Sequence, residues 1–122
     1  MYLFLFSEAQ AVIKEGTDLH VHEGSPLQLH CKIENATQKP TYLFWFHNST
    51  MVNYESNNRP SLHITEHNYS SILLISNVTK SDAGTYRCEP GLAVSDNITI
   101  HVHSSKYSFR IEILCNYRIN HL

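Results

Sequence analysis

The run from residue 73 to residue 88 reads Leu73-Leu74-Ile75-Ser76-Asn77-Val78-Thr79-Lys80-Ser81-Asp82-Ala83-Gly84-Thr85-Tyr86-Arg87-Cys88. An apolar run, Leu73-Leu74-Ile75, precedes a polar corner, and after it Tyr86 and Cys88 alternate with polar residues, which is typical of two strands joined by a turn. Further short alternating runs lie along the chain, separated by turn residues, at 27–33, 43–47, 62–65 and 98–102. Because no stretch shows a long helical repeat, this pattern favours an all-β sandwich.

Two upstream residues, Cys31 and Trp45, combine with Asp82-Ala83-Gly84-x-Tyr86-x-Cys88 in a pattern that resembles the immunoglobulin superfamily. The resemblance implies an immunoglobulin-like antiparallel β-sandwich of the intermediate or variable-like set. It implies that Cys31 and Cys88 pair between two sheets, that Trp45 packs against the sulfurs, and that Tyr86 bonds backbone at a strand corner. We expect Asp82 to be a structural charge at that corner, facing Arg59. The expected core residues are Trp45, Tyr86, Leu73, Ile75 and Asp82.

Three local runs resemble a narrower family, the arthropod neuronal surface proteins called defective proboscis extension response (dpr) proteins. They are the hairpin at 39–54, the closing strand at 97–103, and the opening run at 18–27, which is similar to the start of their second immunoglobulin domain. This resemblance implies a fragment of a two-domain, membrane-attached receptor that matches neurons by binding sister immunoglobulin receptors, mainly through its first domain. The segment 90–94 departs from the family pattern.

The length of 122 residues suits one domain, which we place at residues 10–104. Residues 1–9 are interpreted as an apolar leader remnant, because the apolar start is short and has no charged residue before it. Residues 105–122 form a tail with a strand-like alternation and no obvious partner strand. Its Cys115 is the odd cysteine, either a free thiol or an inter-chain bridge.

Composition excludes several functional classes. A formal net charge of −2 gives no basic field for a phosphate backbone, so we expect no nucleic-acid partner. No run approaches the roughly 20 apolar residues that span a bilayer, so membrane attachment would come through missing parts of the parent chain. The sequence has no nucleophile elbow, phosphate-cradling glycine loop or His-Glu-x-x-His pair, and we expect neither an enzyme nor a cofactor.

Disulfide chemistry and glycosylation signals indicate an extracellular or cell-surface location. A disulfide persists outside the reducing cytosol. Asn-x-Ser/Thr triplets are more frequent than this composition gives by chance, although turns are rich in the same residues. The candidate glycosylation sites are Asn35, Asn48, Asn68, Asn77 and Asn97.

One predicted strand carries apolar residues on both faces. Leu43 and Trp45 should point inward, which leaves Tyr42, Phe44 and Phe46 outward. Three aromatic residues on one sheet face predict a docking surface, and the alternative is a contact within the parent chain that covers them.

Histidines form a second surface feature. The alternation puts His20 and His22 outward on one edge strand and His101 and His103 outward on the strand beside it. The favoured interpretation is a solvated polar face, and the alternatives are a pH-sensing strip or a site for Zn²⁺ or Cu²⁺.

These observations predict a cell-surface recognition or adhesion module that binds other immunoglobulin-superfamily proteins, as one domain of a neuronal receptor. Two alternatives remain open. One is a structural spacer that binds nothing, and the other is a secreted, soluble immunoglobulin-type ligand binder.

Overall fold

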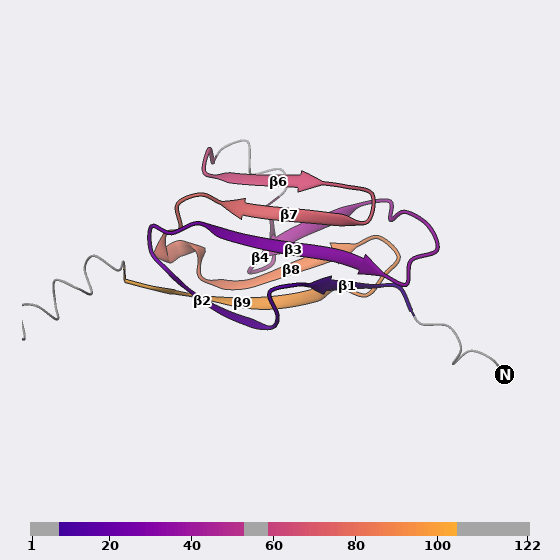
Figure 1. Ribbon diagram of the computed structural model, residues 1–122, viewed down its shortest axis with the longest axis horizontal. Helices are drawn as coiled ribbons and strands as arrows, with labels where there is room; N and C mark the ends of the chain where they lie inside the picture. Colours follow the sequence, from indigo (N-terminus) through magenta and orange to yellow (C-terminus); the bar gives the residue numbers. More distant parts are fainter. Residues whose placement is uncertain (1–7, 53–58, 105–122) are drawn as a thin grey trace, which may run out of the picture.

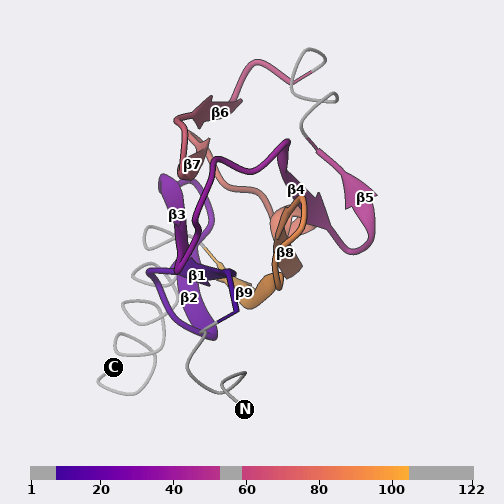
Figure 2. The same cartoon turned by 90° about the vertical axis from the view of Figure 1, so that its right-hand side faces the viewer.

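The computed structural model describes residues 8–52 and 59–104 of the chain. These residues form two β-sheets packed face to face, and the edge view of Figure 2 shows β6, β7 and β3 on one side and β5, β4 and β8 on the other. The all-β, immunoglobulin-like sandwich predicted from the sequence is confirmed.

The first sheet has four strands in the order β1-β3-β7-β6, all antiparallel (Figure 1). Buried and more exposed residues alternate along the longest of them, because one face packs against the other sheet and the opposite face meets solvent. The strand bounds are β1 (Gln10–Ile13), β3 (Leu27–Glu34), β7 (Ser70–Ile75) and β6 (Leu62–Glu66).

The second sheet has five strands in the order β2-β9-β8-β4-β5. Its edge strand β2 runs parallel to β9, so the sandwich is not antiparallel throughout as the sequence suggested. The strand before it, β1, already runs parallel to the segment that leads into β9, with a parallel bridge from Gln10 to Val94. After a turn, β2 keeps the direction of β1 and pairs with β9. The bounds are β2 (Asp18–His22), β9 (Asp96–His103), β8 (Gly84–Pro90), β4 (Leu43–His47) and β5 (Thr50–Met51).

The core lies between the sheets and centres on the Cys31–Cys88 disulfide, which confirms the pairing expected from the family resemblance. The chain-entropy model gives about 4 kcal/mol of stabilisation for a closed loop of 57 residues. Trp45 is fully buried and its Nε1 donates to Ser71 Oγ across the sheets at 3.0 Å, which satisfies the indole N–H. Other fully buried core residues are Leu29, Leu73, Ile75, Ile98 and Ile100.

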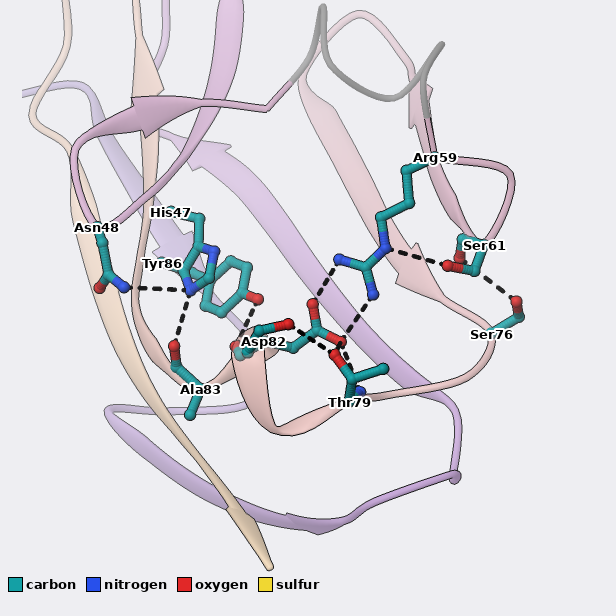
Figure 3. Close-up of polar contacts among 10 residues, drawn as sticks. His47, Asn48, Arg59, Ser61, Ser76, Thr79, Asp82, Ala83 and Tyr86 are labelled. Carbon is teal, nitrogen blue, oxygen red and sulfur yellow. Dashed lines mark hydrogen bonds and ion pairs between the residues drawn. The ribbon is translucent and has the colours of Figure 1, made fainter.

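A polar corner between β7 and β8 organises one end of the sandwich (Figure 3). The 3₁₀ turn η3 (Lys80–Asp82) presents Asp82, whose Oδ1 and Oδ2 accept bonds from the two terminal nitrogens of Arg59 at 2.5 and 2.7 Å. Thr79 donates its backbone N–H to Asp82 Oδ2 at 2.7 Å. Tyr86 donates its hydroxyl to the Asp82 carbonyl at 2.6 Å, which closes the corner.

Asp82 is 1% exposed, yet it remains ionised because its partners outweigh the cost of burial. Burial, the largest single influence, raises the pKa of Asp82, but the hydrogen bonds from Arg59 and Thr79 and the charge of Arg59 together hold it below the ordinary range. The hydroxyl of Tyr86 stays protonated, because burial raises its pKa. A depressed pKa means that the folded state favours the ionised carboxylate, which links this corner to stability against acid.

We expect Asp82→Asn to lower the free energy of unfolding by about 2–3 kcal/mol at pH 7, because it breaks a charge-assisted pair and leaves Arg59 unmatched. The stabilisation by Asp82 is complete above the ordinary carboxyl pKa of 3.8 and is lost as the pH falls through the lower folded value. The gap between wild type and variant should therefore narrow below pH 3.8. Urea unfolding followed by the fluorescence of Trp45 measures both quantities.

The control is Glu34→Gln, since Glu34 is exposed at the end of β3 and its substitution should change the unfolding free energy by less than about 0.5 kcal/mol. An Asp82→Asn deficit that stayed constant between pH 7 and pH 3 would contradict the assigned role of the carboxylate.

Candidate functional site

The outward face of the second sheet carries the residues that the sequence singled out. Strand register fixes this face, because Trp45 and Cys88 are directly opposed and both buried, so their neighbours in each strand point away from the core. The outward residues are Asp18, His20 and His22 of β2, Asn97, Thr99, His101 and His103 of β9, Thr85, Arg87 and Glu89 of β8, and Phe44 and Phe46 of β4.

The three predicted aromatics do lie on this side of the sheet, but they are not equally exposed. Tyr42 is 41% exposed and stacks on Phe44, with ring centroids 4.6 Å apart and planes 20° from parallel. Phe44 and Phe46 are half-buried. The sequence predicted three exposed aromatic side chains. Of these, Tyr42 is exposed, whereas Phe44 and Phe46 present only part of their surface to solvent.

Arg87 accounts for part of this cover. Its guanidinium carbon lies 4.5 Å from the centroid of the Phe46 ring, a cation–π arrangement between neighbouring strands. Arg87 Nε is 3.1 Å from Glu89 Oε1 but lacks hydrogen-bond geometry, so this buried nitrogen has no hydrogen-bond partner among the described residues. We call Tyr42, Phe44, Phe46 and Arg87 the aromatic face.

All five candidate glycosylation asparagines are exposed. Asn35 follows β3, Asn68 lies in the turn between β6 and β7, and Asn77 follows β7, so these three belong to the four-stranded sheet. Asn97 and Asn48 instead belong to the five-stranded sheet. Asn97 pairs directly with Arg87 across β8 and β9, and it lines one surface depression together with Asn48, Phe46 and Arg87.

Asn48 occupies the tight turn between β4 and β5 with a φ of 47°. Its Oδ1 accepts the backbone N–H of Thr85 at 3.0 Å, and a Cβ on Gly84 (φ 128°) would lie 2.5 Å from that oxygen, so only glycine fits there. His47 Nε2 donates to the Ala83 carbonyl at 2.8 Å and therefore has no lone pair for Asn48 Nδ2, 3.4 Å away (Figure 3). The amide nitrogen that a glycan would use is thus not held by His47.

The four predicted strip histidines are brought together by the parallel pairing of β2 and β9, in which His20 opposes His101 and His22 opposes His103. The His20 ring stacks on that of His101, with centroids 4.3 Å apart, and lies edge to edge with that of His103, with centroids 5.0 Å apart. His20 Nδ1 and His103 Nε2 lie 2.8 Å apart, and His22 Nδ1 lies 3.2 Å from the Ser104 carbonyl oxygen. The pH-sensing interpretation of this strip stays a prediction.

Sequence reasoning missed a carboxylate in the same cluster. Asp18 Oδ1 lies 2.5 Å from His101 Nε2, and Asp18 Oδ2 lies 3.6 Å from His20 Nε2. Within the described residues, Asp18, His20 and His101 are the group whose ligand atoms lie close enough together to hold a metal ion. The alternation Asp18-x-His20-x-His22 was the signal that could have found this residue.

A second unpredicted polar pair lies on the other sheet. Glu15 accepts the backbone N–H of His30 at 2.7 Å and contacts His30 Nδ1 at 2.7 Å. This pair closes the turn after β1 onto β3 and has a structural role. Cys115 and the tail lie outside the described residues.

No helix in the described part of the chain has the length and apolar character to cross a bilayer.

Comparison with known proteins supports the architecture. Residues 11–90 match the family model described as immunoglobulin domain. Over 69 residues the chain is 32% identical to the mouse tyrosine-protein kinase receptor TYRO3. The matched stretch covers 57% of this chain and 7% of that receptor, so the chain spans a small fraction of this relative.

Two solved structures illustrate the shared fold. Dpr2 Ig1-Ig2, crystallised in complex with DIP-Theta Ig1-Ig3, has a TM-score of 0.66 at 23% identity and covers 81% of this chain and 51% of that one. Titin M4 has a TM-score of 0.60 at 20% identity and covers 79% of this chain and 97% of that one. With the family model matching residues 11–90 and the disulfide, buried tryptophan and tyrosine corner all in place, the chain belongs to the immunoglobulin domain family.

Proposed function

We propose that this domain is an extracellular recognition module that binds another immunoglobulin-superfamily protein through its aromatic face. The observation that carries the proposal is the stacked pair of Tyr42 and Phe44 beside the Arg87–Phe46 contact, all on the outward side of β4 and β8. Tyrosine and arginine are the residue types that dominate binding energy at protein interfaces, and aromatic rings lose little conformational entropy when they are buried.

The polar atoms of this face favour a protein partner that offers hydrogen-bond acceptors over a partner with only apolar surface. Arg87 Nε is buried without a hydrogen-bond partner among the described residues, and Glu89 beside it is a charged acceptor. A partner that covers Tyr42 and supplies a carbonyl or carboxylate near the guanidinium would gain both apolar burial and a charge-assisted hydrogen bond. A flat sheet of another immunoglobulin domain has the shape to provide such a surface.

The partner class and location follow from the covalent chemistry and from the relatives. A buried disulfide is typical of proteins outside the reducing cytosol, and TYRO3 is a receptor. The solved Dpr2 structure holds two immunoglobulin proteins in complex, which is a property of those proteins. We propose further that this chain is the second immunoglobulin domain of a dpr-type receptor at the neuronal surface, where it takes part in synaptic matching.

A specific observation favours the spacer alternative. Phe44 and Phe46 are half-buried, and Asn97, a candidate glycan site, pairs directly with Arg87 on the same face. A domain whose sheet face is covered by its own arginine and by a glycan would hold a neighbouring domain in place without binding a partner. The soluble-binder alternative has no such observation in its favour.

We expect Phe44→Asp combined with Phe46→Asp to abolish binding to an immunoglobulin-superfamily partner, because the contact would lose two aromatic rings and would have to remove two carboxylates from water. The chain, secreted from insect cells with a heterologous leader, would be presented as a tetramer to cells that each display one arthropod immunoglobulin receptor. The wild type should bind at least one receptor, and surface plasmon resonance should show at least a tenfold loss of affinity for the variant.

The matched control is His63→Asp combined with Thr65→Asp, two exposed positions with the same spacing on β6 of the other sheet. This control should bind as the wild type does. If the wild-type chain binds no receptor in the panel, the recognition proposal is contradicted and the spacer function is favoured.

We also expect glycosylation of Asn97 to weaken binding through the aromatic face, since a glycan there would lie beside Arg87 and Phe46. Asn97→Gln should remove one endoglycosidase-sensitive mass increment and raise the affinity for the partner. Asn68→Gln, in the turn between β6 and β7, should remove an increment and leave affinity unchanged. Equal affinities for Asn97→Gln and the wild type would argue that the contact surface lies elsewhere.

A further inference from the structure

The edge of the five-stranded sheet opposite β5 brings three metal-ligating side chains to one point. Asp18 and His20 are two residues apart on β2 and therefore share a face, and the parallel register sets His101 of β9 directly beside His20. The sheet order β2-β9-β8-β4-β5 puts β8 between this cluster and the strand of Phe44 and Phe46, and Arg87 of β8 pairs with Asn97, four residues along β9 from His101. The cluster is thus separate from the aromatic face.

The three side chains of the cluster hold their ligand atoms within reach of one divalent cation. Asp18 offers two oxygens, of which Oδ1 is 2.5 Å from His101 Nε2 and Oδ2 is 3.6 Å from His20 Nε2, and the three ligand atoms lie within 4.8 Å of one another. Ligand atoms that bind zinc at about 2.0–2.2 Å in tetrahedral geometry lie roughly 3.3–3.6 Å apart. The 2.5 Å contact is a hydrogen bond from the His101 Nε2–H to Asp18 Oδ1, so a bound ion would displace this proton and the two atoms would move about 1 Å apart.

A neighbouring histidine orients one of the ligands. His20 Nδ1 lies 2.8 Å from His103 Nε2, and when Nδ1 carries the proton of that bond, His20 Nε2 carries the lone pair and faces Asp18. Ligating histidines usually donate their second ring N–H to a partner in this way, which fixes the tautomer. The stacking of His20 on His101 holds the His20 ring in the same orientation.

We propose that Asp18, His20 and His101 form a binding site for Zn²⁺ or a similar divalent transition-metal ion, with His103 as a positioning residue for His20. Two imidazoles and one carboxylate are a ligand set that zinc accepts, and the remaining coordination position is left for water or for a side chain of another molecule. Because Asp18 and His20 lie on β2 and His101 lies on β9, a bound ion would join the edge strand to the sheet. It would therefore raise the thermal stability of the domain.

The test is a zinc titration of the full chain carrying Cys115→Ser, so that the thiol of residue 115 cannot compete for the metal. Calorimetry should show that one equivalent of zinc binds. The midpoint temperature of thermal unfolding should rise when zinc is added and should fall back when a chelator removes it. Asp18→Ala and His101→Ala should each abolish this binding, and His103→Ala should weaken it by about tenfold. His63→Ala, on β6 of the other sheet, should bind zinc as the parent does.

A measurement on the unsubstituted histidines covers the case in which a variant fails to fold. In imidazole ¹H–¹³C spectra, zinc should shift the ring resonances of His20 and His101 and leave those of His63 and His67 in place. Absence of a stoichiometric site, zinc affinity that survives both Asp18→Ala and His101→Ala, or zinc shifts confined to other histidines would each overturn the proposal.

Discussion

The Cys31–Cys88 disulfide crosses the middle of the sandwich, and the indole of Trp45 lies on the strand beside Cys88. These two features determine how the two sheets face each other. The disulfide connects β3 to β8, and Trp45, which opposes Cys88 on the adjacent strand, donates its N–H to Ser71 of β7, itself paired with Cys31. A covalent bond and a hydrogen bond therefore cross the same small volume between the sheets. Because these links fix which face of β4 and β8 is buried, they also fix which residues are presented to solvent.

The strands were predictable because each has one buried face, which leaves a period of two in the sequence, as along Leu27 to Ile33. The direction of β2 was not, since a period of two is the same for parallel and antiparallel neighbours. The cover of Phe46 by Arg87 also lay beyond sequence reasoning, because it depends on the register between β4 and β8. The alternation of Asp18, His20 and His22 placed Asp18 on the histidine face, but its contact with His101 depends on the register between β2 and β9.

One sheet carries two chemically different surfaces, and their separation follows from strand order. The aromatic face belongs to β4 and β8, the histidines belong to β2 and β9, and Asn97 of β9 lies between the two. A docked protein on the first surface and an ion on the second would not compete for the same atoms. Asn97 is the one of the five candidate glycan sites that lies on β9, the strand of His101, and it pairs with Arg87 of the aromatic face.

The parallel pairing of β2 with β9 has a mechanical consequence. The chain enters β2 near one end of the pair and leaves β9 at the other end, so tension that reaches these two strands pulls them along their length in opposite senses. All the backbone hydrogen bonds between them then bear load together in shear, whereas an antiparallel hairpin pulled from its open end loses its bonds one after another. If the domain is pulled by its two ends, this edge should separate only at a high force, and its hydrogen bonds should then break in a single step.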